Sequence, residues 1–235
     1  MFVPPELLLV DKPKGISSFD VIRRLRRYYG DLHNGEKAPK MGHAGTLDPL
    51  ATGLMIIGVG AGTKKLSVLT KLDKEYLAEV LIGERRSTGD MEGEVVEEKE
   101  VREAVEILQS KISTALTNML GEITLPVSAY SAIKVNGTPI YKLARKAVNI
   151  GNIGVEVPVR VMKIHKTELL KLNISGNRAV ATILFSVSSG TYIRSLAEEL
   201  GRRIGYPATL QNLRRTKVGD FDIKDAVQIK ETWII

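Results

Sequence analysis

The sequence predicts a mixed α+β fold. Short apolar runs typical of strands and amphipathic patterns typical of helices follow one another in an irregular order, without the strand–helix–strand alternation of a doubly wound sheet. Hydrophobic residues make up 43% of the 235 residues, which is enough to bury a core. No repeat, low-complexity tract or Pro/Ser-rich linker divides the chain, so we expect a single domain over residues 1–235.

The N-terminal part predicts a strand and then a helix. The strand covers Leu7–Val10 and ends in the turn sequence DKPKG. Ser17 or Ser18 can cap the helix, because apolar residues then recur at helical spacing up to Tyr29. The other helix face carries four arginines, at positions 23, 24, 26 and 27. Such a face is either a solvated surface or a phosphate contact, and the basic balance of the chain favours the contact.

The remaining elements follow from similar patterns. Strands are expected over 54–60 and 76–83, the second with the partial alternation of a half-buried antiparallel strand. A polar turn, ERRSTGDMEGE, follows, and then one or two helices within 101–120, ended by Gly121. Two further strands, over 155–171 and 178–187, and a helix over Arg194–Ile204 complete the prediction.

Composition narrows the classes of function. Lys and Arg number 34 against 27 Asp and Glu, a net charge of +7 that should attract polyanions. The chain has no cysteine, and its three histidines lie too far apart for a local ligand pair, so we expect no metal site. The longest apolar runs are far shorter than the roughly 20 residues that span a bilayer, and the N-terminus has no signal-peptide pattern. We therefore expect no membrane contact and a cytoplasmic location.

Two nucleotide-binding templates and two catalytic templates do not fit. The segment GVGAGTK, residues 58–64, follows a predicted strand, but its glycines match neither the dinucleotide fingerprint nor the phosphate loop. We interpret it as a tight strand exit with a helix starting near Thr63. No serine lies in a Gly-x-Ser-x-Gly elbow, and Glu198 and Glu199 are helix neighbours that face different directions.

One aspartate, Asp48, lies within the segment GHAGTLDPLATG, residues 42–53. The neighbouring residues alone suggest a structural role for Asp48. An Asp at an N-cap, followed by Pro49, can start a short helix through Leu50 and Ala51. The whole segment, however, resembles the signature of the TruB family of pseudouridine synthases, in which this aspartate is the catalytic nucleophile. Other segments resemble the family in the same order: DKPKG (11–15), DKEY (73–76), TGDMEG (88–93), YSAIKVNG (130–137), SGTYIRSL (189–196) and NLRRT (212–216).

The resemblance implies a pseudouridine synthase fold: a mixed, largely antiparallel sheet flanked by helices, with a central RNA-binding cleft. It implies that the T-arm of tRNA is the partner, that the T-loop uridine at tRNA position 55 is the substrate, and that no cofactor is needed. The C-terminal PUA module that often accompanies this domain is not expected here, and we expect a monomer.

The resemblance also implies roles for individual residues. Arg194 is expected beside the Asp48 carboxylate, and Tyr76 is expected to stack on the target base. Tyr192 and Leu213 wall the pocket, and His43 contacts the displaced RNA. Taken singly, a Tyr or Leu in a strand pattern is more often ordinary core, so these roles depend on the motifs around them. From chemistry alone, Asp48 could attack the sugar or the base, or assist removal of a sugar proton, and the residues leave that choice open.

Two alternatives remain at this point. One is a relative of the guide-RNA-dependent pseudouridine synthases, whose catalytic motifs are similar but which rely on a PUA module. The other is an RNA-binding or RNA-folding protein that keeps the cleft without turnover. The presence of Asp48, Tyr76 and Arg194 favours an enzyme over the second alternative.

If the arginine face contacts RNA, neutralising Arg23, Arg24 and Arg27 together should weaken tRNA binding. The plot of log affinity against log salt should become shallower by roughly one unit for each lost phosphate contact. Filter binding over a series of KCl concentrations measures both quantities. An unchanged slope would assign these arginines to a solvated face.

Overall fold

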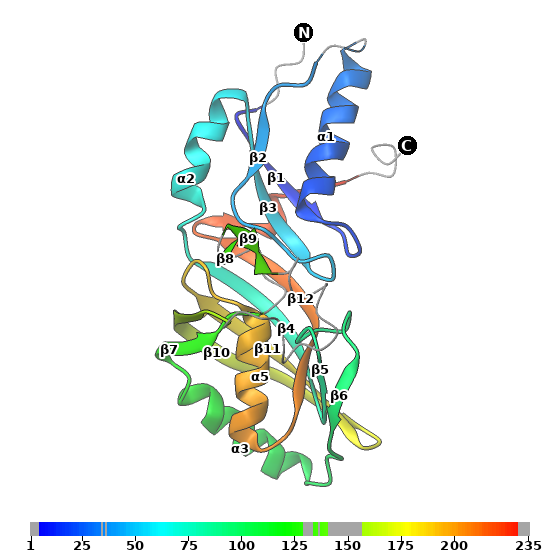
Figure 1. The fold of residues 1–235 in the computed structure, drawn as a ribbon, viewed down its shortest axis with the longest axis vertical. Coiled ribbons are helices and arrows are strands. Elements are labelled where there is room, and N and C mark those ends of the chain that lie inside the picture. The colour runs from blue at the N-terminus through cyan, green and yellow to red at the C-terminus, as the bar shows by residue number, and fades with distance from the viewer. Residues whose placement is uncertain are drawn as a thin grey trace. The chain divides into compact units, whose positions relative to one another are not determined.

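The structure is a computed structural model that describes residues 5–33, 35, 37–128, 134–135, 137–140 and 157–229. The chain forms two compact units (Figure 1). The first unit comprises Met1–Leu77 and Leu213–Ile235, and the second comprises Ala78–Asn212. Two strands, β4 (Lys74–Ile82) and β12 (Ala208–Val218), run through both units.

The first unit is a mixed sheet with one long helix. The order of its strands is β14-β1-β3-β12, with β2 paired to β3 and β13 to β12. The β14–β1 and β3–β12 pairs are parallel, and the β1–β3, β2–β3 and β12–β13 pairs are antiparallel. Its elements are β1 (Leu7–Lys12), α1 (Ser18–Leu32), β2 (Met41–His43), β3 (Thr52–Val59), α2 (Leu66–Leu69), β13 (Phe221–Asp222), β14 (Val227–Gln228) and two 3-10 turns, Gly60–Lys65 and Ile223–Asp225.

The second unit is built on long antiparallel strands. β10 pairs with β11 on one side and with β7 on the other, and α3 packs against both β10 and α5. Its elements are β5 (Glu84–Arg86), β6 (Val95–Glu98), α3 (Val105–Thr117), β7 (Gly121–Pro126), β8 (Lys134–Val135), β9 (Thr138–Pro139), β10 (Val159–Ser175), β11 (Arg178–Val187) and α5 (Ile193–Ile204). Together with the first unit, these elements confirm the predicted α+β class and its largely antiparallel pairing.

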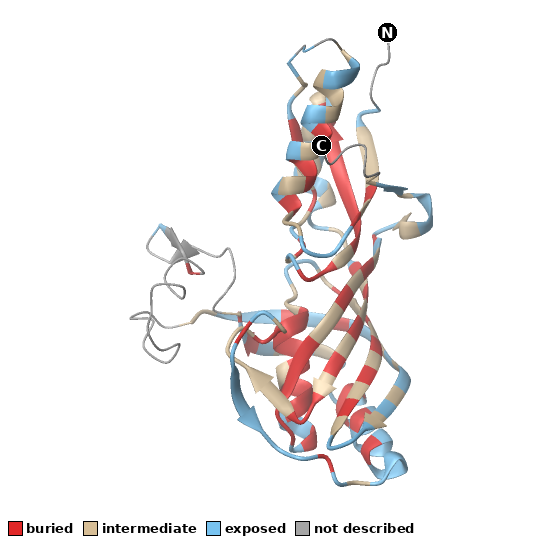
Figure 2. Ribbon diagram, turned by 90° about the vertical axis from the view of Figure 1, so that its right-hand side faces the viewer, coloured by how far each residue is buried: buried red, intermediate tan, exposed pale blue. Residues whose placement is uncertain are grey.

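Burial follows the patterns that predicted the elements. Side chains alternate between buried and half-buried along β4 and β11, as Figure 2 shows. Helix α1 begins where predicted: the Ser17 hydroxyl accepts a hydrogen bond from the Asp20 N–H, and the Asp20 carboxylate accepts one from the Ser17 N–H. Arg23, Arg26 and Arg27 are exposed on this helix, and Arg23 pairs with Asp20 at 2.6 Å.

Several predicted boundaries were wrong. The polar turn is shorter than expected, because Glu84–Arg86 pairs with Val95–Glu98 as a hairpin. The helix expected from Thr63 is a 3-10 turn followed by the short α2, because Gly62 packs against backbone: a Cβ there would lie 1.9 Å from the Glu6 carbonyl oxygen. β10 runs on to Ser175, and residues 155 and 156 lie outside the described residues. Most of the YSAIKVNG segment also lies outside them.

No helix in the described part of the chain is long and apolar enough to span a bilayer.

At Gly53, the backbone of β3 lies in close contact with the backbone of β12. Its φ is +107°, and a Cβ at this position would lie 2.3 Å from the carbonyl oxygen of Arg215, its partner in the parallel register. Gly53→Ala should therefore lower the free energy of unfolding by about 3 kcal/mol or more, through both strain and overlap. Urea unfolding measures this free energy.

The control is Gly15→Ala, where φ is +86° but no atom lies within 4 Å of the added Cβ. Strain alone should then cost about 1–2 kcal/mol. Equal losses for the two variants would show that the contact with Arg215 is not the cause.

Candidate active site

Asp48 lies on a turn between β2 and β3 and is half-buried. The Ala51 N–H donates to the Asp48 carbonyl oxygen at 3.0 Å, and β3 begins at Thr52. The predicted short helix after Asp48 is therefore wrong. The carbonyl oxygens of Pro49 and Ala51 accept hydrogen bonds from the Lys12 ammonium at 3.3 and 2.6 Å. The Pro49 oxygen also accepts one from the Gly15 N–H at 2.8 Å.

Two buried side chains, Lys12 and Arg215, stabilise the turn through hydrogen bonds to its backbone. Lys12 is 0% exposed, so its ammonium is excluded from water. Arg215 is 1% exposed, and its guanidinium donates to the carbonyl oxygens of Leu54, at 2.7 Å, and Gly45, at 3.1 Å. A buried charge without hydrogen bonds is costly in free energy. Any movement of these carbonyl oxygens away from Lys12 or Arg215 is therefore unfavourable, and the turn is held in one conformation.

The residue before Asp48 is fixed from helix α1. The Leu47 N–H donates to the Ser18 hydroxyl at 2.8 Å, and that hydroxyl donates to the Leu47 carbonyl oxygen at 3.0 Å. Ser18 is 2% exposed, so water does not compete for these bonds. The backbone that presents Asp48 is thus anchored on both sides.

His43 and Lys74 lie near the Arg215 guanidinium. Burial and the Arg215 charge lower the pKa of His43, so its ring is neutral at neutral pH. Its buried Nδ1 has no hydrogen-bond partner within the described residues. Burial and Arg215 also lower the pKa of Lys74 to about 8, against the opposing charge of Asp73. The Lys74 ammonium donates to the carbonyl oxygens of Thr70, at 2.6 Å, and Leu72.

Tyr76 and Leu213 belong to the same unit as Asp48 and His43. Tyr76 is 7% exposed on the inward face of β4, and Leu213 is 8% exposed on β12. The Leu213 carbonyl oxygen accepts a hydrogen bond from the Thr52 hydroxyl at 3.4 Å, close to the Asp48 turn in the chain. Their contact with a target base stays a prediction.

Tyr192 and Arg194 belong to the second unit, at the start of α5. Arg194 is 5% exposed; its Nη1 donates to the Thr88 carbonyl oxygen at 3.1 Å and lies 3.5 Å from the Asp90 carboxylate. The pairing of Arg194 with Asp48 stays a prediction, because the two residues lie in different units.

The Asp90 carboxylate stabilises the loop in which Asp90 lies. Oδ1 of Asp90 accepts hydrogen bonds from the Thr88 hydroxyl, at 2.5 Å, and from the Glu92 N–H, at 3.1 Å. Oδ2 faces Arg194. The two oxygens therefore serve different neighbours, which fixes both the loop and the guanidinium.

Within the described residues, no group of three or more His, Asp or Glu side chains could hold a metal ion. In the first unit, the Asp48 carboxylate is presented on a turn that buried cations fix. An ionised aspartate held in this way can support covalent or acid–base chemistry.

Family models match nearly all of the chain. The model "TruB family pseudouridylate synthase (N terminal domain)" matches residues 33–193, and "tRNA pseudouridylate synthase B C-terminal domain" matches residues 194–232. The chain belongs to the TruB family of pseudouridylate synthases. The expected family resemblance is thereby confirmed.

Curated relatives agree with this assignment. The tRNA pseudouridine synthase B of Mycobacterium avium (strain 104) is 39% identical over 97% of this chain and 69% of its own length. The protein of the same name from Oenococcus oeni (strain ATCC BAA-331 / PSU-1) is 35% identical over 96% of this chain and 72% of its own length.

Solved structures support the fold. A "Crystal Structure of a Cbf5-Nop10-Gar1 Complex" aligns with a TM-score of 0.65 and 24% identity, covering 97% of this chain and 53% of that one. A "Structure of H/ACA RNP bound to a substrate RNA containing 2'-deoxyuridine" gives 0.61 and 23%, covering 94% and 50%. At these identities the likeness concerns the fold alone.

Four residues that fix backbone or charge within the two units were not selected as site residues from the sequence: Lys12, Lys74, Asp90 and Arg215. Each lies in a segment that resembled the family, so the motifs contained the signal. What the motifs did not reveal was which charged side chains are buried, and in which hydrogen bonds.

The lowered pKa of Lys74 predicts a pH-dependent stability. Its folded-state pKa of about 8 lies below the ordinary 10.5, so between these values the unfolded chain binds more protons and folding gains stability as the pH rises. From pH 7.5 to 10.5, the wild-type chain should gain at most about 3 kcal/mol relative to Lys74→Met. Urea unfolding of both proteins at several pH values measures the difference; parallel pH profiles would contradict it.

Proposed function

We propose that this chain is a tRNA pseudouridine synthase that isomerises the T-loop uridine at tRNA position 55, with Asp48 as the catalytic nucleophile. The observation that carries the proposal is the presentation of Asp48. Within a family of pseudouridylate synthases, the turn holding this carboxylate is fixed by Lys12, Ser18 and Arg215.

The reaction needs little beyond a positioned carboxylate. The N1–C1′ bond of uridine breaks, the uracil turns, and a C5–C1′ bond forms. C5 then loses its proton to solvent while N1 gains one, so atoms balance without oxidation or hydrolysis. This chemistry is consistent with the expectation that no cofactor is required.

The second unit supplies the proposed counter-charge. Arg194 is 5% exposed, so its guanidinium lies in a region where water screens charges weakly. Its bonds to Thr88 and Asp90 restrict its rotamers. We propose that it stabilises the ionised Asp48 during the reaction.

Access to the uridine requires that the base leave the loop stack. We propose that the base stacks on Tyr76 and that Tyr192 and Leu213 complete the walls. His43 is neutral, and its buried Nδ1 has no hydrogen-bond partner among the described residues; we propose that this ring contacts the displaced RNA without adding a charge. The net charge of +7 suits a polyanionic partner, and we keep the expectation of a monomer that acts in the cytoplasm.

A tritium-release assay tests the reaction, because the isomerisation frees the label at uracil C5 of a tRNA transcript into water. Asp48→Asn should reduce release by roughly 100- to 10,000-fold, since the amide is neither nucleophile nor base. Asp220→Asn, which changes an exposed aspartate in the same way, is the matched control and should leave the rate unchanged.

If the wild-type chain binds tRNA but releases no tritium, the RNA-binding alternative replaces the enzyme. Equal release by Asp48→Asn and wild type would refute the role of Asp48. Thermal unfolding of both variants checks that each is folded.

A further inference from the structure

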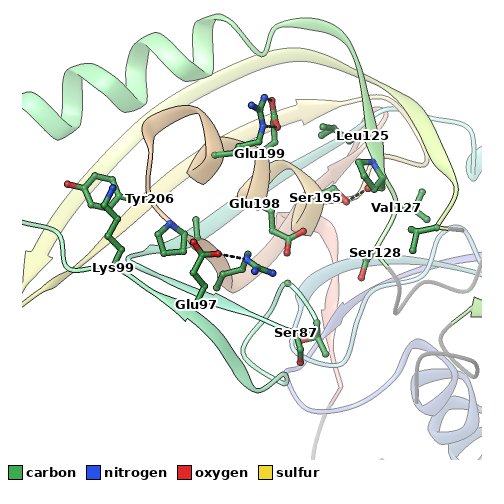
Figure 3. Close-up of a pocket in the computed structure, with 18 of the residues that line it drawn as sticks. Ser87, Glu97, Lys99, Leu125, Val127, Ser128, Ser195, Glu198, Glu199 and Tyr206 are labelled. Carbon is green, nitrogen blue, oxygen red and sulfur yellow. Dashed lines mark hydrogen bonds and ion pairs between the residues drawn. The ribbon is translucent and has the colours of Figure 1, made fainter. Parts of the chain in front are cut away.

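The second unit contains an open pocket of about 850 Å³. It lies between α5, the β5–β6 hairpin and the end of β7 (Figure 3). Leu125, Pro126 and Val127 form an apolar part of its wall, and Ser87, Thr88 and Gly89 also line it. The volume falls within the roughly 300–1,000 Å³ that small-molecule sites occupy.

Most charged groups of the pocket already have partners. Arg85 pairs with Glu97 at 3.0 Å, and Glu199 pairs with Arg202 at 2.7 Å. The Lys99 ammonium donates to the Gly205 carbonyl oxygen at 2.7 Å. These groups need no ligand to be satisfied.

Glu198 differs from them. Its half-buried side chain extends from α5 into the pocket (Figure 3), and within the described residues its carboxylate accepts no hydrogen bond and forms no ion pair. One carboxylate oxygen lies close to Gly89, 3.4 Å from where a Cβ would be. Burial raises the pKa of Glu198, although Arg85 and Arg194 oppose the shift.

The chemistry of Glu198 selects the ligand. An ionised carboxylate only accepts hydrogen bonds, so the ligand must present N–H or O–H groups. Among the nucleobases, guanine alone presents two adjacent donors, N1–H and the N2 amino group, which match the two oxygens of a carboxylate. Adenine and cytosine place a ring acceptor beside their amino group, and uracil places carbonyls on both sides of N3–H.

The mouth of the pocket suits a phosphate. The Arg85 and Arg202 side chains are 42% and 71% exposed in their ion pairs. The Arg85–Glu97 pair is exposed on both sides and contributes little stability, so the Arg85 guanidinium can turn to a phosphate. Glu199 is buried in its pair with Arg202, but it keeps Arg203 as a second partner at 2.6 Å, so Arg202 can turn as well.

We propose that this pocket binds a guanine nucleotide, with Glu198 accepting hydrogen bonds from N1–H and the N2 amino group and with Arg85 and Arg202 facing the phosphate. The nucleotide is either an unpaired guanosine of an RNA or a free nucleotide. The inference goes beyond the proposed function and does not depend on it.

Binding of guanosine 5′-monophosphate to the full chain, followed by ligand-observed NMR, tests the site. Inosine 5′-monophosphate lacks only the N2 amino group and should bind at least tenfold more weakly. Glu198→Gln should weaken binding of the guanosine nucleotide at least tenfold, whereas Glu122→Gln, an exposed glutamate on β7, should not change it. Equal binding of the two nucleotides by the wild-type chain would exclude a free nucleotide as the ligand even if Glu198→Gln failed to fold, and the RNA arm then decides the site.

A second arm identifies the source of the base, using a short single-stranded RNA with one guanosine and its inosine counterpart. A Glu198-dependent preference for guanosine seen only in the RNA assigns the pocket to RNA, and one seen with the mononucleotide assigns it to a free nucleotide. No such preference in either arm overturns the site. Tritium release by the same preparations reports the synthase activity separately.

Discussion

Hydrogen bonds from buried cations to backbone carbonyl oxygens are the constraint on which the first unit depends. Lys12 and Arg215 are almost fully excluded from water, where an unsatisfied charge would cost far more than one interaction returns. Their bonds to Pro49, Ala51 and Gly45 therefore fix the backbone on both sides of Asp48. The geometry of the carboxylate follows from where these cations are buried.

The second unit also buries a cation, Arg194, but pairs it with a carboxylate, that of Asp90. Arg194 is buried at the start of α5, and its charge is balanced by Asp90 and by the Thr88 carbonyl oxygen. The first unit instead surrounds its cations with neutral carbonyl oxygens. Burial, together with the charge of Arg215, lowers the pKa of His43 and Lys74 there.

The fold was largely predictable because local patterns and tertiary structure agree. The strand over 178–187 matches β11, and α1 begins at the predicted cap, Ser17. The short helix after Asp48 does not form: β3 begins at Thr52, and the Ala51 carbonyl oxygen binds Lys12, 39 residues away. Asp90 received no role because its loop meets Arg194 only in the folded chain; Thr88 and Arg194 are 106 residues apart. Local pattern cannot reveal such partners.

The divided carboxylate of Asp90 has a thermodynamic consequence. One oxygen closes the loop through Thr88 and Glu92, and the other faces Arg194; the same loop lines the pocket at Thr88 and Gly89. The order of the loop and the position of the Arg194 guanidinium therefore both depend on the Asp90 carboxylate. Because such coupling is reciprocal, a ligand that stabilises the loop also stabilises the position of Arg194. A ligand that displaces Arg194 destabilises the loop by the same free energy.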